Sequence, residues 1–313
     1  MKLTSLAVSL LAASSMLVVA NQGGGSISFV DRDSLQVLET IEAGVGPHEA
    51  AASPDGSRVA ITLYGRQTAS REVLLVDPKT RSIVKRIDLA PSERPHGVTW
   101  RRGGIYVTLE KEGSVARIDP STGAIAWRAK TGGEVGHMLA VTRDEKKLYT
   151  GNLKTNDISA IRIGEASAYK TIKVGAGPEG IALSPDDREL WAAHRMAGGI
   201  SIIDTAKDEV IATIAPEIFS ARVTMTPDGK KVLLFDMASK SVVLFDRATR
   251  KEIGRVATAE GVPVGGSVTP DSSRAYVLRY QPDAIVELDL KTLKFGREVQ
   301  TAQAPDGLAI LGK

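Results

Sequence analysis

Three of the four histidines in this chain occupy the same position in an internal repeat. His48, His96 and His137 each lie six residues before the proline position of a turn, which in its first copy is the motif at residues 53–56, Ser-Pro-Asp-Gly. Equivalent positions are 41 to 48 residues apart. A nearly fixed period of this size indicates an array of supersecondary units. The other repeats place Glu179, Ala221, Val264 and Asp306 at this position.

Three imidazoles brought together by such repeats would suit a divalent metal ion. Neutral imidazole nitrogens about 2.0 to 2.1 Å from a centre, with one position left for water or a ligand, form a catalytic type of zinc shell. We expect His48, His96 and His137 to be metal ligands. If the array closes into a ring, the last repeat lies beside the first, and Asp306 joins the histidines as a fourth ligand, as a carboxylate that supports a ligand, or as a general base. The predicted cofactor is zinc or another divalent transition metal ion.

Two residues of the fourth repeat are candidates for proton transfer. Glu179 takes the histidine position there, and His194 follows the next apolar run. A metal-bound water or a polarised carbonyl needs a nearby group that accepts or donates a proton. Glu179 and His194 are therefore the predicted catalytic residues.

Four more residues are expected to contact a ligand at the same end of the molecule. Glu49 and Arg222 come one residue after the histidine position, and Tyr64 and Arg279 lie where the second apolar run of their repeats ends. A guanidinium group binds a carboxylate in bidentate fashion, so the arginines would suit an anionic group on the ligand. Equally, each arginine could pair with a nearby acid such as Asp236 or Glu49.

The elements that must position these residues are short β-strands. In the fourth repeat, apolar runs at residues 180–183, 190–193, 200–204 and 210–214 are separated by turn-forming residues. Runs of this length with tight turns are typical of an antiparallel sheet, and no window has the spacing of an amphipathic helix. Each repeat is thus predicted to be one four-stranded blade in an all-β protein.

Counting blades predicts how the array closes. Six complete repeats begin at the histidine positions, and residues 305–311 remain as a lone inner strand. Residues 17–31 align without a gap on residues 190–204, so they supply the missing strands of a seventh blade. Pairing the two chain ends removes the exposed sheet edges of an open array. With the four strands of each blade lettered A to D from the axis outward, we predict a seven-bladed β-propeller over residues 16–313, closed by N-terminal strands B to D and a C-terminal strand A.

The chain resembles the YVTN-repeat family of bacterial seven-bladed β-propellers. The resemblance is carried by motifs such as residues 177–186, Gly-Pro-Glu-Gly-Ile-Ala-Leu-Ser-Pro-Asp, and residues 200–205, Ile-Ser-Ile-Ile-Asp-Thr. It covers nearly the whole chain from residue 16 onward and implies the fold. It implies little about function, because such propellers include DNA binders, surface-layer proteins and enzymes.

The N-terminus has the features of a secretory signal peptide over residues 1–15. Met1 and Lys2 precede an apolar stretch at residues 3–13, which is too short to span a bilayer, and small residues follow. The mature protein is therefore expected to be periplasmic or secreted, without a transmembrane segment. The alternative is an uncleaved membrane anchor.

Composition excludes several classes of function. The absence of cysteine excludes disulfides and thiolate chemistry. A net charge of +3 and 4% aromatic residues give no basic patch with stacking platforms, so nucleic-acid binding is not expected. We expect a monomer that binds a small molecule.

Two hypotheses for function remain. The first is a metal-dependent hydrolase or lyase that holds a divalent ion and a small ligand in a funnel on the top face. The second is a non-catalytic propeller that recognises a ligand or protein and uses its histidines structurally, as WD-type propellers do near the same loop. Inherited structural histidines would make the seven positions uniform, whereas four of them differ.

Overall fold

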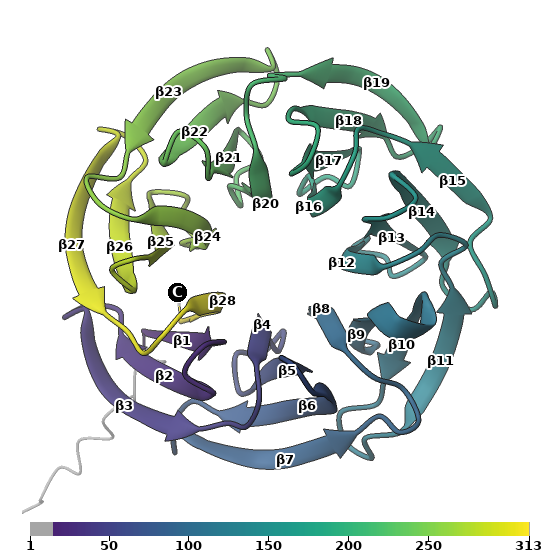
Figure 1. Ribbon diagram of the computed structural model, residues 1–313, viewed down its shortest axis with the longest axis horizontal. Coiled ribbons are helices and arrows are strands. Elements are labelled where there is room, and N and C mark those ends of the chain that lie inside the picture. The colour runs from purple at the N-terminus through teal and green to yellow at the C-terminus, as the bar shows by residue number, and fades with distance from the viewer. Residues whose placement is uncertain (1–14, 313) are drawn as a thin grey trace, which may run out of the picture.

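The computed structural model describes residues 15–312 and confirms a seven-bladed β-propeller. Seven four-stranded antiparallel sheets surround a central axis, with one strand of each sheet innermost (Figure 1). Apart from Ser15, the predicted signal peptide lies outside the described residues. No helix within residues 15–312 has the length and apolar character needed to cross a membrane.

Six blades are formed by consecutive strands, in order from the innermost strand outward. Blade one is β4 (Pro47–Ala52), β5 (Val59–Gly65), β6 (Ala69–Asp77) and β7 (Ser82–Asp88); blade two is β8 (Pro95–Arg101), β9 (Gly104–Leu109), β10 (Ser114–Ile118) and β11 (Ile125–Lys130). Blade three is β12 (Gly136–Val141), β13 (Lys147–Asn152), β14 (Asp157–Arg162) and β15 (Lys170–Lys173); blade four is β16 (Pro178–Leu183), β17 (Glu189–His194), β18 (Ile200–Asp204) and β19 (Glu209–Ile214). Blade five is β20 (Ser220–Met225), β21 (Lys231–Asp236), β22 (Ser241–Asp246) and β23 (Lys251–Ala257); blade six is β24 (Val262–Val268), β25 (Arg274–Tyr280), β26 (Ala284–Asp289) and β27 (Lys294–Gln300).

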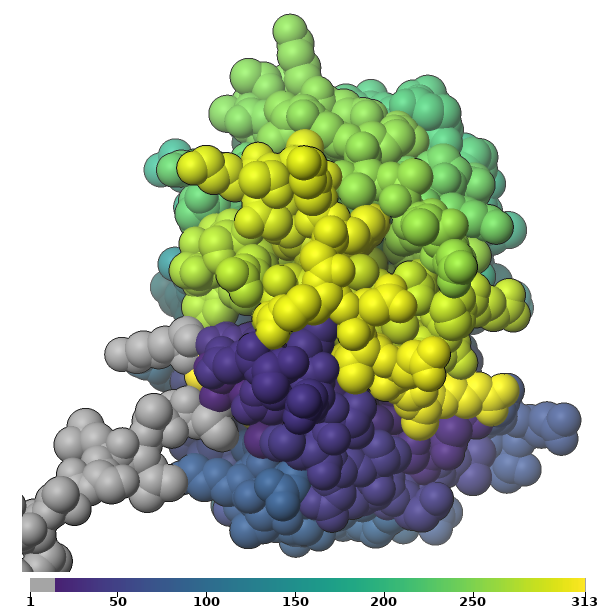
Figure 2. All heavy atoms as spheres, turned by 90° about the vertical axis from the view of Figure 1, so that its left-hand side faces the viewer, coloured from purple at the N-terminus to yellow at the C-terminus, as the bar shows by residue number. Residues whose placement is uncertain are grey.

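Blade seven joins the two ends of the chain, as predicted. Its strand order is β28 (Pro305–Leu311), β1 (Met16–Asn21), β2 (Ser26–Asp31) and β3 (Gln36–Glu42). Met16 pairs with Leu311 across the antiparallel β1–β28 ladder. The N-terminal strands and the C-terminal segment lie side by side in both views of the molecule (Figures 1 and 2). The ring therefore closes through backbone hydrogen bonds.

The hydrophobic core lies between the blades. One cluster packs Ile27 and Phe29 of blade seven against Ile61 and Leu74 of blade one, and all four side chains are fully buried. Similar clusters fill the other six interfaces between neighbouring blades. Outer strands such as β3 are mostly exposed. The middle strands are thus buried on both faces, which makes each blade a rigid support for its inner strand.

Every inner strand contains a bulge near the top of the channel. In blade one, Pro47 pairs with Leu63 and Ala50 with Ile61, so β4 has one residue more than β5 between these pairs. The same irregularity occurs in the other six blades. A bulge bends a strand and re-aims its side chains. Successive residues at the top of an inner strand can therefore both face the channel.

One short helical turn was not expected from the sequence. The 3-10 helix η1 (Glu110–Glu112) replaces a tight turn between β9 and β10. It ends at Gly113, whose φ of 55° lies in the left-handed region that glycine adopts readily. This turn sets the direction of Glu110 at the top face.

Candidate functional site

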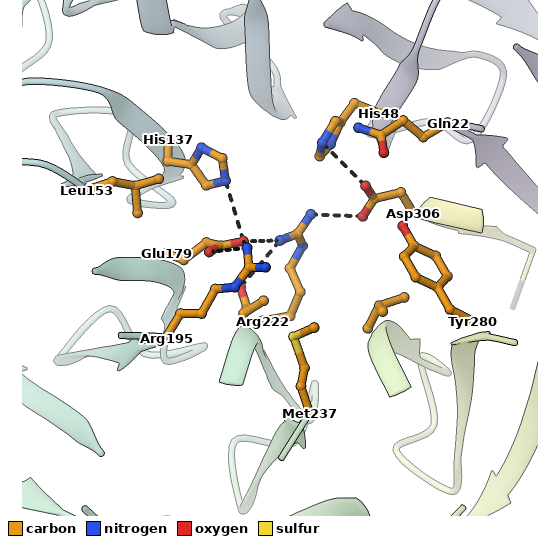
Figure 3. Close-up of a pocket in the computed structure, with 12 residues that line it drawn as sticks. Gln22, His48, His137, Leu153, Glu179, Arg195, Arg222, Met237, Tyr280 and Asp306 are labelled. Carbon is orange, nitrogen blue, oxygen red and sulfur yellow. Dashed lines mark hydrogen bonds and ion pairs between the residues drawn. The ribbon is translucent and has the colours of Figure 1, made fainter. Parts of the chain in front are cut away.

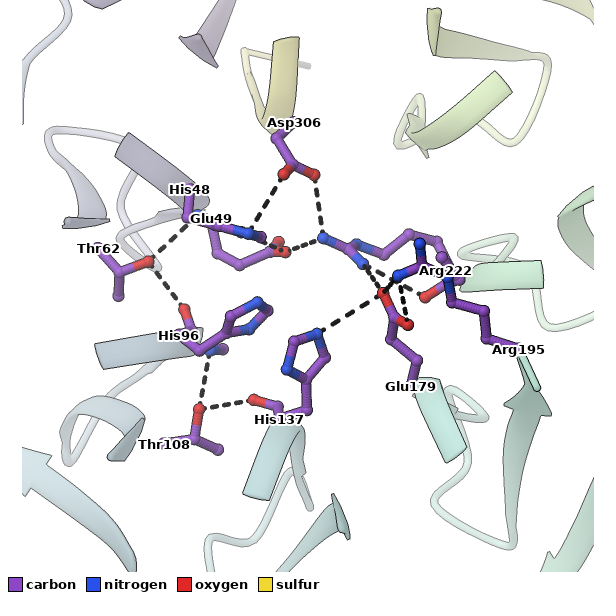
Figure 4. A network of polar contacts seen from close by, with 12 residues as sticks. His48, Glu49, Thr62, His96, Thr108, His137, Glu179, Arg195, Arg222 and Asp306 are labelled. Carbon is purple, nitrogen blue, oxygen red and sulfur yellow. Dashed lines mark hydrogen bonds and ion pairs between the residues drawn. The ribbon is translucent and has the colours of Figure 1, made fainter. Parts of the chain in front are cut away.

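The three repeated histidines converge at the top of the channel. The ring centroids of His48 and His96 are 4.1 Å apart, and those of His96 and His137 are 3.5 Å apart. His96 is the middle ring and is only 1% exposed. The side chains come from β4, β8 and β12, the inner strands of three consecutive blades (Figure 4). The predicted convergence of the imidazoles is therefore present in the structure.

Hydroxyl groups from the second strands fix the spacing of these inner strands. Thr62 on β5 donates to the carbonyl of His96 at 2.8 Å and accepts from the N–H of Glu49 at 3.1 Å. Thr108 on β9 repeats the pattern one blade further on, where it donates to the carbonyl of His137 at 2.6 Å and accepts from the N–H of Gly97 at 2.8 Å. Blades one, two and three are thus joined directly below the imidazoles.

Glycine permits the close approach of these strands. A Cβ on Gly97 would lie 2.8 Å from the carbonyl oxygen of His137 and 3.0 Å from the Cα of Met138. A Cβ on Gly307 would likewise lie 2.2 Å from the carbonyl oxygen of His48. Contacts this short are not available to a side chain, so glycine lets neighbouring inner strands touch. The close stacking of His96 on His137 depends on the contact that Gly97 allows between β8 and β12.

Carboxylates flank both outer histidines. Nε2 of His48 lies 3.3 Å from Asp306 and its Nδ1 lies 3.4 Å from Glu49. Nδ1 of His137 lies 3.1 Å from Glu110, and its Nε2 lies 3.6 Å from Glu179. Each outer ring therefore has an acid beside both of its nitrogens. This pattern orients imidazoles in metal sites and increases their basicity as ligands.

Tyr64 closes the outer side of the cluster. Its hydroxyl donates to Glu110 at 2.6 Å, and its ring meets those of His48 and His96 edge-on, with centroids 5.4 and 5.2 Å away. The guanidinium of Arg94 lies over the Tyr64 ring at 4.7 Å. Burial and the bond to Glu110 raise the pKa of Tyr64 to about 12. Tyr64 therefore stays protonated and serves as a hydrogen-bond donor at neutral pH.

Arg222 crosses the channel from blade five and holds three acids. It is ion-paired to Glu49, lies 3.1 Å from Asp306, and lies 3.6 Å from Glu179 (Figure 4). Burial lowers the pKa of Arg222, but these three carboxylates outweigh burial and raise it above its ordinary value. The arginine therefore pairs with acids of the chain, the alternative left open by the sequence. Its predicted role in ligand binding stays a prediction.

Burial and charge give the histidines different affinities for protons. Burial, followed by its two histidine neighbours, holds the pKa of His96 well below its ordinary value. Burial also lowers the pKa of His137, but its hydrogen bonds to Glu110 and Glu179 outweigh burial and raise it. His96 is thus a neutral imidazole at physiological pH, the form in which histidine binds metals.

Among residues 15–312, two sets of side chains have the spacing needed to hold a metal ion. The first is His48, Glu49 and His96, and the second is His96, Glu110 and His137; within each set the ligand atoms lie within 4.8 Å of one another. The structure thus places each outer histidine in a different set, with His96 in both. Asp306, predicted as a ligand, is in neither set and contacts the outer side of His48.

A funnel of about 290 Å³ opens beside this cluster. Its wall includes residues from every blade except blade two, and Figure 3 shows them pointing toward the axis. The lining residues are Gln22, His48, His137, Leu153, Glu179, Arg195, Ala221, Arg222, Met237, Val264, Tyr280 and Asp306. A small molecule in the funnel would therefore meet two of the three clustered histidines.

Two predicted site residues lie away from this network. His194 is 1% exposed, and its ring contacts the N–H of Gly175 and the carbonyl of Gly198, both at 3.3 Å. Arg279 bonds to the carbonyl of Pro282 at 3.2 Å and to Glu298 at 3.1 Å. Neither residue lines the funnel. In the structure, both side chains therefore contact loops and do not lie beside the predicted metal ligands.

The residues that follow His194 and Arg279 line the funnel instead. Arg195 lies 2.9 Å from Glu179, and Tyr280 stands beside Asp306 (Figure 3). Successive residues of a strand point to opposite faces, so a shift of one position exchanges the two faces. Glu110 and Tyr280 follow the second apolar run of their repeats, which the sequence places on the funnel face, but they were not among the predicted site residues. The signal for all three was the position just after the second strand.

The fold and this site define a seven-bladed β-propeller with histidines and carboxylates gathered at one mouth of its channel. The chain belongs to the YNCE-like beta-propeller family, whose model matches residues 99–274. This confirms the resemblance to a YVTN-type propeller. A comparison with curated proteins gave no match.

Solved structures share the fold at low sequence identity. Kuenenia stuttgartiensis hydrazine synthase is 17% identical with a TM-score of 0.76, covering 96% of this chain and 99% of that one. The dihydro-heme d1 dehydrogenase NirN in complex with DHE is 15% identical with a TM-score of 0.72, covering 95% and 75%. A functionally unknown protein from Desulfotomaculum acetoxidans is 12% identical with a TM-score of 0.81, covering 96% and 99%. At these identities the similarity concerns the fold alone.

Proposed function

We propose that the mouth of this propeller binds a divalent transition metal ion through its histidines and the glutamates beside them. The observation that carries the proposal is a buried imidazole nitrogen, Nδ1 of His96, that has no hydrogen-bond or ion-pair partner within residues 15–312. Buried polar atoms are normally satisfied, so such atoms point to a missing partner. Imidazole nitrogens beside carboxylates are the donors that zinc and its neighbours in the first transition series prefer.

The charge of the network supports a cation there. Four carboxylates, those of Glu49, Glu110, Glu179 and Asp306, contact the histidines, whereas two guanidinium groups, those of Arg195 and Arg222, contact the carboxylates. With neutral imidazoles, these six groups carry two negative charges in excess, or one when the nearby guanidinium of Arg94 is included. Unpaired buried charge is costly, and a divalent ion would offset it.

The metal would act on a small molecule in the funnel. Each donor set has three protein ligands, which leaves a coordination position for water or substrate, as in catalytic sites. A bound ion polarises a carbonyl or lowers the pKa of its water, so the reaction class we propose is metal-assisted hydrolysis or elimination. Secretion to the periplasm or beyond, through a signal peptide at residues 1–15, belongs to the same proposal.

One observation favours the second candidate, a non-catalytic recognition propeller. Burial raises the pKa of Glu179, but His137, Arg222 and Arg195 outweigh burial and hold it at about 2. A carboxylate with so low a pKa is a weak base at neutral pH. His194 is held by backbone groups. Neither predicted catalytic residue is thus suited to proton transfer, and in an enzyme this would fall to a metal-bound hydroxide.

Metal content is the direct test of the proposal. We expect near-stoichiometric zinc in purified protein after loading and dialysis, and loss of that zinc in the triple variant H48A/H96A/H137A. The matched control is H194A, which removes the one histidine outside the network and should keep its metal. Equal metal in the triple variant and the wild type would refute the proposal, provided that circular dichroism shows both to be folded.

Turnover separates the two candidates. Hydrolysis of a panel of p-nitrophenyl carboxyl and phosphate esters by the metal-loaded protein, lost in the triple variant, would support an enzyme. Metal binding without turnover of any ester would favour the recognition propeller.

A further inference from the structure

The two donor sets share one residue, and that residue has a special place in the cluster. His96 belongs to both sets, and its ring lies between those of His48 and His137, with centroids 4.1 and 3.5 Å away. A single ion bound equally by all three histidines would need their nitrogens around one point. The structure instead brings the donor atoms together in two sets that share His96, and its ring lies between those of His48 and His137 (Figure 4).

Each set has a supporting acid of its own outside the set. Asp306 lies 3.3 Å from Nε2 of His48, and Glu179 lies 3.6 Å from Nε2 of His137. Both have largely buried side chains, and both are held by Arg222. A carboxylate behind a histidine ligand fixes the ring and favours metal binding at its other nitrogen. The two halves of the site are therefore built alike, each with a histidine between an inner and an outer acid.

His96 differs from its neighbours in having no acid paired with it. Within residues 15–312 it makes no ion pair, and its Nδ1 has no hydrogen-bond partner although the residue is 1% exposed. A buried imidazole normally has a donor or acceptor at each nitrogen. Because the ring belongs to both donor sets and its Nδ1 is unsatisfied, a metal ion is the partner that the surrounding donors suit best.

We propose that the mouth holds two divalent ions, one in each donor set, with the ring of His96 bridging them. This inference rests on the proposed function. When the first ion binds one nitrogen, His96 keeps its remaining ring proton on the other. Binding of the second ion displaces that proton to solvent and leaves an imidazolate, so the second ion adds one net positive charge. The acids of the cluster, with their excess of negative charge, favour that change.

Zinc stoichiometry tests the two-ion site. The wild type should bind two equivalents after Zn²⁺ loading, measured by inductively coupled plasma mass spectrometry. E49Q and E110Q, which preserve side-chain size, should each retain one equivalent, as should H48A and H137A. H96A should retain none at concentrations that saturate the wild type, and H194A should retain two. Melting temperatures of all variants establish that they are folded.

Copper provides an independent readout of the bridge. Two Cu²⁺ ions joined by an imidazolate couple magnetically, so the wild type should give a paramagnetic resonance signal well below its copper content. E49Q and E110Q should each give a full signal for one isolated ion.

The outcomes separate the two proposals. One equivalent in the wild type, lost in every histidine variant, would overturn the second ion but keep the metal site. Two equivalents that persist in H96A would overturn the bridge. No bound metal in any protein would overturn both proposals.

Discussion

The two faces of the propeller differ in how closely the repeats agree. On the bottom face, a Ser or Thr hydroxyl donates to the Asp two residues later in five blades, at 2.5 to 2.8 Å. On the top face, the seven equivalent positions hold three histidines, two acids and two aliphatic residues. One scaffold thus repeats its turn chemistry at one end and varies its side chains at the other.

The two faces differ because their side chains form hydrogen bonds and ion pairs with different kinds of partners. The bottom turns satisfy backbone groups within one blade, so the same solution serves each time. The top residues contact one another across the axis, so each can differ and still take part in a single network. Mutations should therefore act locally on the bottom face and collectively on the top face.

The largest expected effect follows from removing the central cation of the top face. R222M leaves Glu49, Asp306 and Glu179 without their shared partner, and loss of one member of a buried ionic network costs about 3–5 kcal/mol. The free energy of unfolding in urea measures the change.

A bottom-face arginine is the matched control for R222M. Arg247 also pairs with two acids, Asp186 and Glu189, but it lies nearer to solvent. R247M should cost about 1 kcal/mol or less. Equal losses from the two substitutions would remove the contrast between the faces.

A smaller effect is expected where blades two and three touch. G97A places a Cβ against the carbonyl of His137, and overpacking of this kind costs about 1–3 kcal/mol. Because it separates His96 from His137, zinc affinity measured by calorimetry should fall by at least about tenfold. G296A, on an outer strand with more space for a Cβ, should change neither stability nor affinity. Wild-type affinity in G97A would show that the close approach is unnecessary.

Removing the hydrogen bonds of a single turn on the bottom face should lower the stability of the fold by less than G97A does. T226V removes a hydroxyl that donates to Asp228 at 2.6 Å and accepts from the N–H of Lys231 at 2.9 Å. Loss of such bonds costs about 0.5–1.5 kcal/mol. Thermal unfolding measures this loss, and the zinc content should stay that of the wild type. A change in zinc content would show that the two faces are coupled.

The smallest effect concerns pH. The hydroxyl of Ser53 and the N–H of Ser57 lower the pKa of Asp55 to about 2, and Thr269 and Ser273 do the same for Asp271. A carboxyl whose pKa is lower in the folded state stabilises the fold above the unfolded pKa near 4 and loses this effect as pH falls toward 2. The melting temperature should thus decline over that window, and less steeply in D55N/D271N. Identical slopes would contradict the assignment.

The fold could be predicted almost completely from the sequence. The repeat near 42 residues and the alternation of apolar runs are local patterns, and residues 17–31 match a segment of the fourth repeat directly. The pairing of β1 with β28 follows from closing the ring. The helical turn at Glu110–Glu112 was missed, because one turn leaves no periodic signal.

The site was predictable in part. Convergence of His48, His96 and His137 follows from their equivalent positions in adjacent blades. The directions of the His194 and Arg279 side chains were not predictable. A shift of one residue at the end of a strand moves a side chain from the face that lines the funnel to the opposite face. The contacts of Asp306 with His48 and Arg222 likewise depend on side-chain reach across the axis.

By itself, the sequence determined the number of blades, the closure of the ring and the seven positions that meet at its mouth. These follow from periodicity and from the rule that sheet edges must be paired. Only the tertiary structure decided which acid faces which histidine and that Arg222 holds three acids at once. Such contacts depend on bulges, rotamers and the close approach of backbones at glycine, which act over a few ångströms between residues far apart in the chain.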